Sequence, residues 1–223
     1  MAKRILITGA SSGIGASTAE MAVAEGHSVA LVARSKDKLD ALVSQLGGEK
    51  AHAIVADVAD WDDAQRMVAE ANERLEGIDV VFANAGRGGG PGGYTEGDVE
   101  MWRSLIDVNI YGLALTVRAS AAALKASKGH LLITSSIAGR RTIQGSVYGM
   151  TKWAATAIGY NVREEFKPHD VRVTLIEPGM VDTSFFDEPK PDALKPEDVA
   201  RSVLFAINQP KHVSLTELVV TPS

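Results

Sequence analysis

Seven short apolar runs recur along this chain, and most of them are separated by segments of helical length and pattern. Each run has the length of a buried strand and is rich in Val, Ile and Leu. Among the intervening segments, residues 61–77 repeat apolar side chains on one helical face. Such alternation is typical of βαβ units, which build a parallel sheet with helices on both faces. We therefore predict a doubly wound α/β fold with a seven-stranded parallel sheet, its strands at residues 4–7, 29–33, 51–56, 79–83, 130–134, 171–176 and 217–220.

No linker, internal repeat or low-complexity segment divides the sequence. The glycine-rich stretch 86–94, GRGGGPGGY, lies inside the alternation and is too short to join two domains. The chain is 45% hydrophobic and 23% charged, an ordinary globular balance that can bury a sizeable core. We therefore expect one domain over residues 1–223.

Composition and spacing argue against several kinds of site. The chain has no cysteine, which excludes disulfides, thiolate metal sites and cysteine nucleophiles. Its five histidines show no H-x-x-x-H or comparable spacing, so we expect no metal site. A net charge of −5, without a basic run interleaved with aromatic residues, argues against nucleic-acid binding. The apolar start is too short for a signal peptide and no stretch suits a membrane span, so we expect a soluble, cytoplasmic protein without a membrane partner.

A glycine loop follows the first apolar run. Residues 8–15 read TGASSGIG and open a helical segment. Such a loop lets the backbone approach a phosphate closely, and the helix N-terminus supplies unpaired N–H groups for it. The glycines are spaced G-x-x-x-G-x-G, and the alternative is a plain strand–helix turn.

Arg34 bears on the choice of cofactor. Dinucleotide sites often place an acid after the second strand for the ribose 2′-hydroxyl, or an arginine for a 2′-phosphate. Here Arg34 and Ser35 follow the second run, and the next carboxylate is Asp37. A guanidinium suits a phosphate, so we predict NADP(H) rather than NAD(H). The alternative is that Arg34 is a solvated loop charge.

Several further motifs occur in one order along the chain. Asp57-Val58 and Asn84-Ala85-Gly86 follow the third and fourth runs, and the later ones are DVNIYG (107–112), ITSSIAG (133–139), YGMTK (148–152) and PGMVDT (178–183). With these motifs the chain resembles the short-chain dehydrogenase/reductase family over nearly its whole length. The resemblance implies a Rossmann-type domain that binds a nicotinamide dinucleotide, and Arg34 favours NADP(H).

The resemblance also implies roles for the cofactor-binding residues. The pyrophosphate and adenosine end would contact Gly9, Ser11, Ser12, Gly13 and Ile14, with Asp57 and Val58 at the adenine and Asn84, Ala85 and Gly86 behind the ribose. The nicotinamide would be flanked by Pro178, Gly179, Val181 and Thr183. Taken alone, Asp57 reads better as a helix or turn cap.

Tyr148 and Lys152 lie one helical turn apart, so both can act on one small object. Reducing a carbonyl needs a hydride and a proton for the developing alkoxide. Lowering a tyrosine pKa from about 10 to about 7 requires roughly 4 kcal/mol. One cation at ~4 Å supplies this at an effective dielectric of about 20, but not in bulk water. The family pattern agrees, with Tyr148 as general acid/base and Lys152 also binding the nicotinamide ribose. A surface pair is the alternative.

A serine hydroxyl would complete the site, and two are candidates. Alignment on S-x-A-G selects Ser136, whereas the usual interval to Tyr148 selects Ser135, because this chain is one residue shorter there. We choose Ser136, since the loop 140–146 can absorb the shortening. By resemblance, Asn109 would anchor a water that relays protons from Lys152. A polar helix interruption is the alternative for Asn109.

The substrate and assembly are less defined by the sequence. Residues 86–94, 140–146 and 182–196 can border a pocket for a small carbonyl or alcohol substrate. Arg140 and Arg141 are candidates for a substrate carboxylate, with solvated loop charges as the alternative. Alanine-rich helices at 113–127 and about 148–166 favour a homodimer or homotetramer, as in the family. The leading function is an NADP(H)-dependent oxidoreductase that interconverts a carbonyl and an alcohol. An NADP(H)-binding sensor without turnover is the second hypothesis, and an epimerase or dehydratase of the same fold is the third.

Overall fold

The computed structural model describes residues 2–183, 185 and 188–223. In this part of the chain seven strands form one parallel sheet in the order β3-β2-β1-β4-β5-β6-β7. The predicted seven-stranded parallel sheet is confirmed, and each strand end lies within two residues of its expected place. The strands are β1 (Arg4–Thr8), β2 (Ser28–Ala33), β3 (Ala51–Val55), β4 (Val80–Ala83), β5 (His130–Thr134), β6 (Arg172–Pro178) and β7 (Glu217–Val220).

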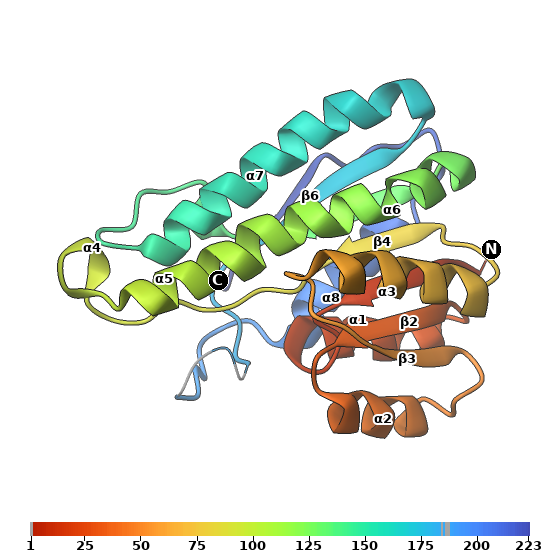
Figure 1. Ribbon diagram of the computed structural model, residues 1–223, viewed down its shortest axis with the longest axis horizontal. Helices are drawn as coiled ribbons and strands as arrows, with labels where there is room; N and C mark the ends of the chain where they lie inside the picture. The colour runs from red at the N-terminus through yellow and green to blue at the C-terminus, as the bar shows by residue number, and fades with distance from the viewer. Residues whose placement is uncertain (1, 184, 186–187) are drawn as a thin grey trace.

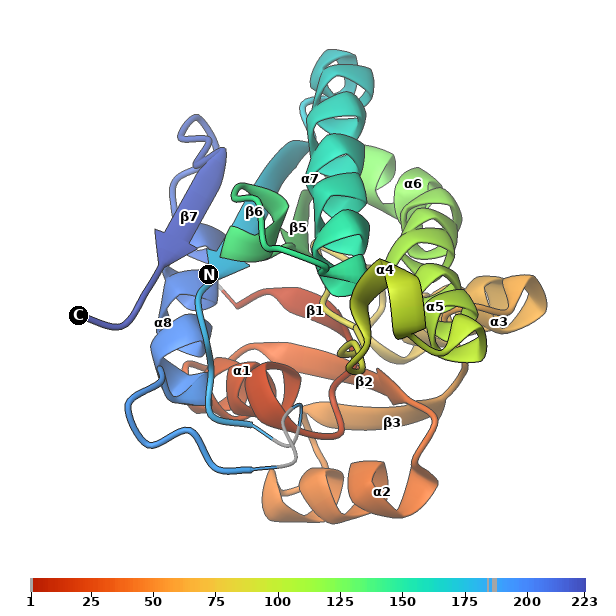
Figure 2. The same cartoon turned by 90° about the vertical axis from the view of Figure 1, so that its left-hand side faces the viewer.

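Helices cover both faces of the sheet (Figures 1 and 2). On one face α1, α2 and α8 pack against the strands, and on the other α3, α6 and α7 do so. A π-helical turn over Asp107–Gly112 joins α5 to α6. The helices are α1 (Gly13–Ala24), α2 (Lys36–Gln45), α3 (Trp61–Arg74), α4 (Gly93–Glu96), α5 (Val99–Ile106), α6 (Leu113–Ser127), α7 (Val147–Phe166) and α8 (Pro196–Ile207).

The middle residues of the central strands are mainly apolar because both faces of these strands are buried. Alternate side chains of a strand point to opposite faces. Leu6 therefore packs with the α3, α6 and α7 side, whereas Ile5 and Ile7 pack with the α1 and α8 side. In β4, Val81 and Phe82 divide in the same way. A continuous apolar run is what such a two-sided core requires.

The sequence of helix α3 explains where the helix begins and which of its faces is buried. Asp60 precedes it in an extended conformation, and its carboxylate accepts a hydrogen bond from the Asp63 backbone N–H at 2.8 Å. Acidic residues in the first turn and Arg74 in the last turn complement the helix dipole. The buried residues repeat at intervals of three and four, as one face of a helix requires. They are Ala64, Met67, Val68 and Ala71.

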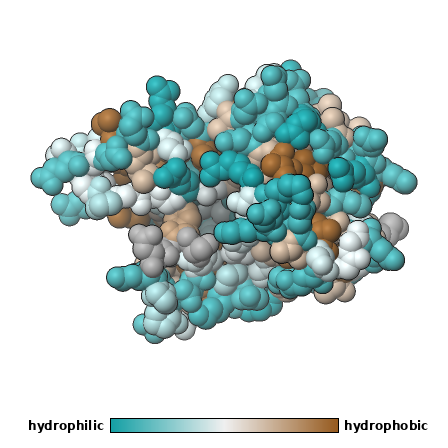
Figure 3. Space-filling view, turned by 60° about the horizontal axis from the view of Figure 1, so that its bottom comes forward, coloured by the Kyte–Doolittle hydropathy of each residue, from teal (hydrophilic) through white to brown (hydrophobic). Residues whose placement is uncertain are grey.

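The visible face in Figure 3 is mainly hydrophilic, with hydrophobic side chains in small separate patches. None of the helices in the described ranges is long and apolar enough to cross a membrane. Since the strands are parallel, the carboxyl ends of β1, β4, β5 and β6 meet at one edge of the sheet. The loops that follow them bring the sequence motifs together there.

Candidate active site

The glycine loop after β1 packs directly against the loop after β4. Gly9 has a φ of +67°, and a Cβ on it would stand 2.8 Å from the Ala85 Cα. A Cβ on Gly15 would stand 2.3 Å from the Gly9 carbonyl oxygen. These two glycines are therefore required by backbone contacts, because no side chain fits between the segments.

The N-terminus of α1 is available to an anion. Ser12 precedes the helix in an extended conformation and its side chain accepts no capping hydrogen bond. The first turn contains no acidic residue, so the positive end of the helix dipole is not compensated there. Ser11, Gly13 and Ile14 are half-buried around this end. The arrangement fits the pyrophosphate of a dinucleotide, since phosphates bind well at helix N-termini.

Arg34 follows β2 and lies close to Asp57, which comes soon after β3. Their charged atoms are 3.8 Å apart, and the Arg34 side chain is 69% exposed. The Asp57 carboxylate also accepts a hydrogen bond from the Ala59 backbone N–H at 3.0 Å. Asp57 thus caps a turn, as its isolated pattern suggested, and is also the ion-pair partner of Arg34. Val58 is buried, and its Cγ2 borders Gly112.

Two threonines at strand ends organise the loop after β4. The Thr8 hydroxyl accepts hydrogen bonds from the backbone N–H groups of Asn84 and Ala85, at 3.0 and 3.1 Å. The Asn84 amide donates to the Thr8 carbonyl and accepts from the Thr134 hydroxyl. Sequence reasoning gave Thr8 and Thr134 no role. The sequence feature that could have identified them is a polar residue at the carboxyl end of an otherwise buried strand, directly before a loop.

Asn109 lies in the π-helical turn and is 3% exposed. Its amide oxygen accepts from the Arg87 backbone N–H at 2.8 Å, and its amide nitrogen donates to the Arg87 carbonyl and the Thr151 hydroxyl. Asn109 therefore joins the glycine-rich stretch to α7. A Cβ on Gly86 would stand 3.5 Å from the Asn109 oxygen and 3.7 Å from the Lys152 Nζ, so the three residues lie together. The proposed water relay stays a prediction.

The two candidate serines face different partners. The Ser135 hydroxyl is buried against α7, where it bonds to the Lys152 carbonyl at 3.1 Å and to the Thr156 hydroxyl at 2.7 Å. The Ser136 hydroxyl accepts from the Ala138 backbone N–H and donates to the Pro178 carbonyl at 3.3 Å. It also lies near enough to the Tyr148 phenol to act on that group's pKa. Only Ser136 therefore shares a site with the phenol. The loop 140–146 contains no helix or strand.

Tyr148 and Lys152 lie in the first two turns of α7, whose start is capped by the Ser146 hydroxyl. The Lys152 Nζ lies 5.7 Å from the centroid of the Tyr148 ring. It donates to the Thr134 carbonyl at 2.9 Å, and the side chain as a whole is buried. The structure thus brings Ser136, Tyr148 and Lys152 together at the sheet edge.

Burial dominates the ionisation of both groups. It raises the pKa of Tyr148 to about 12, an effect that the Ser136 hydrogen bond only partly offsets. It lowers the pKa of Lys152 to about 8, because the ammonium loses its hydration. The expected depression of the Tyr148 pKa by a neighbouring cation is therefore wrong for the protein alone. The same burial that strengthens the cation's effect also disfavours the phenolate.

The segment after β6 returns to the glycine loop. Gly179 donates its N–H to the Val220 carbonyl at 2.7 Å, and Val181 forms an isolated bridge with Leu194. Thr183 lies beside the N-terminus of α1, since a Cβ on Gly13 would stand 3.1 Å from its methyl group. The expected substrate segment 182–196 includes residues 184, 186 and 187, which lie outside the described residues.

Phe185 borders the face of Tyr148. The two rings meet edge-on, with centroids 5.5 Å apart. A Cβ on Gly88 would stand 3.1 Å from the Phe185 ring, so the glycine-rich stretch passes close by. Phe185 and this stretch together limit the space beside the phenol.

Arg140 is not available as a receptor for a substrate carboxylate. Its guanidinium forms ion pairs with Glu177 of β6 and Glu217 of β7. Glu177 is fully buried and directly precedes Pro178. Arg140 thus ties the segment after Ser136 to the strand that carries the predicted nicotinamide segment. Arg141 is exposed.

Comparison with known proteins identifies the family. Residues 3–193 match the family described as short chain dehydrogenase. This chain belongs to the short-chain dehydrogenase family. An uncharacterized oxidoreductase of Staphylococcus aureus (strain MRSA252) is 36% identical over 225 residues, covering 99% of this chain and 97% of the relative. One from Staphylococcus saprophyticus is 35% identical over 228 residues with the same coverage. The chain is therefore an oxidoreductase of the short-chain dehydrogenase family.

Solved structures agree with the fold. An alcohol dehydrogenase of the archaeon Thermococcus sibiricus, in complex with 5-hydroxy-NADP, superimposes with a TM-score of 0.92 at 33% identity, over 100% of this chain and 97% of the other. A serine dehydrogenase of Escherichia coli gives 0.89 at 30% identity, over 98% and 97%. A 3-ketoacyl-(acyl-carrier-protein) reductase of Brucella melitensis, complexed with NADH, gives 0.89 at 26% identity, over 98% and 96%. These complexes support a nicotinamide cofactor.

Within the described residues, no group of three or more His, Asp or Glu side chains is arranged to hold a metal ion.

Proposed function

We propose that this protein is an NADP(H)-dependent oxidoreductase that interconverts a carbonyl and an alcohol by hydride transfer, with Tyr148 as general acid/base. One observation carries the proposal. The Tyr148 phenol lies near Ser136, which acts to lower its pKa, and one helical turn from the buried Lys152. This group stands at the sheet edge where the start of α1 lacks a capping side chain.

Each residue of the group has a definite task. Nicotinamide, when bound, supplies or accepts the hydride. With its pKa raised to about 12, the Tyr148 phenol is protonated at neutral pH and suits proton donation to the substrate oxygen during reduction. Ser136 donates a hydrogen bond to the same oxygen. Lys152 binds the ribose hydroxyls, and Asn109 holds the adjoining loop in place through its bonds to Arg87.

The cofactor would lie along the carboxyl ends of the strands. The uncapped α1 N-terminus and the glycines that no Cβ can replace support a pyrophosphate there. The residues that we assign to cofactor binding are Gly9, Ser11, Ser12, Gly13, Ile14, Arg34, Asp57, Val58, Asn84, Ala85, Gly86, Tyr148, Lys152, Pro178, Gly179, Val181 and Thr183.

Arg34 supports the choice of NADP(H), because its exposed guanidinium follows β2, where a 2′-phosphate would be bound, and no carboxylate precedes Asp37 there. Arg34→Ala should weaken NADPH binding about tenfold or more, since a charge-assisted contact to phosphate is lost. NADH binding should change little. Arg74→Ala, an exposed arginine of α3, is the control. Equal losses for both cofactors would contradict the assignment.

Phe185 and the glycine-rich stretch beside Tyr148 support a small carbonyl substrate. An aldehyde, a ketone or a 3-oxo acid would fit this class. Three similar structures are named alcohol dehydrogenase, serine dehydrogenase and 3-ketoacyl-(acyl-carrier-protein) reductase. These names all refer to alcohol or carbonyl chemistry. They agree with a carbonyl substrate but do not select one.

The decisive test is NADPH oxidation with a panel of aldehydes, ketones and 3-oxo acids. Tyr148→Phe removes the proton donor while keeping the ring, and turnover should fall at least about a hundredfold. Tyr160→Phe removes a hydroxyl from an exposed position of the same helix and should leave turnover unchanged. Equal turnover in the wild type and Tyr148→Phe would refute the proposed role.

The alternative, a sensor that binds NADP(H) without turnover, is not favoured by the intact group of Ser136, Tyr148 and Lys152. Tight NADPH binding with no turnover across the panel would favour it.

We also propose a homodimer or homotetramer. The α7 side chains Trp153 and Tyr160 are 50% and 42% exposed, so that helix presents aromatic surface outward. Sedimentation as a monomer would contradict this assembly.

A further inference from the structure

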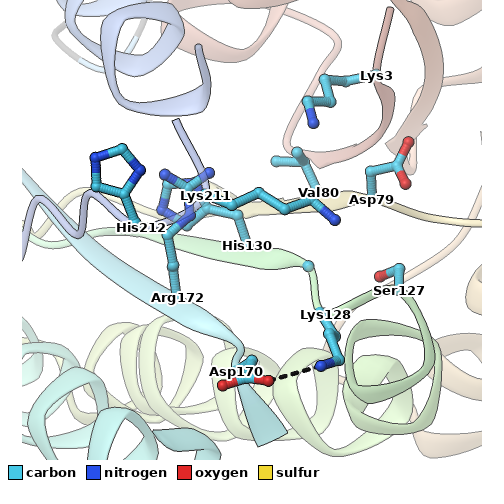
Figure 4. A pocket seen from close by; sticks show the side chains of 11 residues that line it. Lys3, Asp79, Val80, Ser127, Lys128, His130, Asp170, Arg172, Lys211 and His212 are labelled. Carbon is cyan, nitrogen blue, oxygen red and sulfur yellow. Dashed lines mark hydrogen bonds and ion pairs between the residues drawn. The ribbon is translucent and has the colours of Figure 1, made fainter. Parts of the chain in front are cut away.

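A second pocket lies at the opposite edge of the sheet from the proposed active site. It has a volume of about 350 Å³, which is within the range of small-molecule pockets. The amino ends of β4, β5 and β6 contribute Val80, His130 and Arg172 to its wall. Figure 4 shows these side chains together with Lys3, Lys128, Lys211 and His212 around the cavity.

The pocket is positively charged in a chain whose net charge is −5. Its lining contains four Lys and Arg residues and two acids, and both acids already have partners. Asp79 is held by Arg4 through bonds of 2.8 and 3.0 Å, and Asp170 by Lys128 at 2.8 Å. The three remaining cations have no ion pair within the described ranges: Lys3, Arg172 and Lys211.

Arg172 is the least solvated of the three cations. It is half-buried, and the loss of hydration lowers its pKa with no carboxylate to offset the effect. Its guanidinium donates to the Val213 carbonyl at 2.9 Å. This bond fixes the guanidinium beside the segment that carries Lys211 and His212, and its other nitrogens have no hydrogen-bond partner in the described part of the chain.

His130 lies in the pocket wall, where Arg172 and Lys3 act on its ionisation. It is 1% exposed, its Nε2 is bonded to the Thr174 hydroxyl at 2.7 Å, and its Nδ1 has no partner in the described chain. Burial lowers its pKa to about 3, and Arg172 and Lys3 act in the same direction. Its ring therefore stays neutral at pH 7, and the positive charge of the pocket comes from the lysines and Arg172.

We propose that this pocket binds a small phosphate-bearing molecule, whose phosphate lies between Lys3, Arg172 and Lys211. Three cations suit a group with two negative charges, and the planar fork of an arginine suits phosphate oxygens. The proposed cofactor site lies at the carboxyl ends of the strands, whereas this pocket lies at their amino ends. The two sites can therefore be occupied at the same time.

Calorimetric titration with inorganic phosphate and with glycerol 3-phosphate tests the site without relying on turnover. Lys3→Ala/Lys211→Ala should weaken binding at least about tenfold, because two charge-assisted contacts are lost. Neither side chain has an ion pair within the described residues, so the fold should survive. Lys50→Ala is the matched control, an exposed lysine just before β3 that does not line the pocket. It should bind like the wild type.

Arg34→Ala and NMR distinguish this pocket from the proposed cofactor site. Phosphate binding here should persist in Arg34→Ala, and the ring signals of His130 and His212 should shift while that of His52 does not. Loss of binding in Arg34→Ala with retention in the double variant would overturn the inference, as would undetectable binding of both probes by the wild type. NADPH binding and turnover should be unchanged in the double variant, so failure of this site leaves the proposed function standing.

Discussion

Replacing Lys152 by methionine should stabilise the protein while abolishing turnover. The Lys152 side chain is buried, has no carboxylate partner in the described ranges and donates one hydrogen bond, to the Thr134 carbonyl at 2.9 Å. Burial lowers its pKa from 10.5 to about 8. The charged form is therefore less stable in the folded protein than in the unfolded chain. Methionine fills a similar volume without a charge.

The size of the effect follows from the pKa difference. A difference of 10.5 − 8 = 2.5 units corresponds to about 3.4 kcal/mol of destabilisation at pH 7. Methionine removes this cost but leaves the Thr134 carbonyl without its donor, which costs about 1–3 kcal/mol. The variant should therefore gain about 0.5–2.5 kcal/mol in the free energy of unfolding at pH 7. This is a shift of roughly 1–10 °C in Tm for a chain of this size.

The pKa difference also determines how the stability gain of the variant changes with pH. Because the folded-state pKa of this base is the lower one, its destabilising contribution is full below about pH 8. It declines as the pH rises towards 10.5 and vanishes above that value. At pH 9.5 the remaining cost is about 1.4 kcal/mol, so the advantage of the variant nearly disappears.

Urea unfolding at pH 7 and pH 9.5 measures the difference directly. Lys50→Met serves as a control at an exposed lysine and should change stability little at either pH. A Lys152→Met protein that is less stable than the wild type at pH 7 would refute the reasoning. So would a stability difference that stays the same at both pH values.

Four further substitutions test contacts at the same sheet edge. Ser136→Ala should lower kcat about a hundredfold with little loss of stability. Ser135→Ala should lower the free energy of unfolding by about 1–2 kcal/mol and reduce kcat less, because its hydrogen bonds are structural. A larger loss of kcat in Ser135→Ala than in Ser136→Ala would make Ser135 the catalytic serine. Gly9→Ala should lower the free energy of unfolding by about 2–3 kcal/mol, because of its positive φ and the backbone contact that a Cβ would make; an unchanged urea midpoint would contradict this. Glu177→Gln should change the free energy of unfolding by less than about 1 kcal/mol, because burial raises the pKa of Glu177 and the part-exposed Arg140 keeps Glu217 as its partner. A loss of about 3 kcal/mol in the same assay would count against this expectation.

Much of the fold follows from patterns along short stretches of the sequence. Continuous apolar runs such as RILI require two-sided burial, and the spacing of Ala64, Met67 and Val68 requires one helical face. The glycine loop and the Tyr148–Lys152 pair could also be recognised, because each depends on residues within one or two turns of chain. Family resemblance added the order of the motifs.

Interactions between distant segments could not be predicted in this way. The Asn109 amide forms hydrogen bonds with Arg87 and Thr151, which are 22 and 42 residues away in the sequence. Arg140 meets carboxylates on β6 and β7, which only the strand order brings beside it. The expected lowering of the Tyr148 pKa failed for a related reason, since desolvation depends on everything packed around a group.

The sequence by itself determined the strand–helix alternation, the family and the chemical types present at the proposed active site, because periodicity and motifs are local properties. The tertiary structure decided the strand order, which serine faces the phenol, and the ionisation of Tyr148 and Lys152. It also assembled the cationic pocket from β4, β5, β6 and the segments that precede the strands. These features depend on distances between residues far apart in the chain, and only the folded sheet sets those distances.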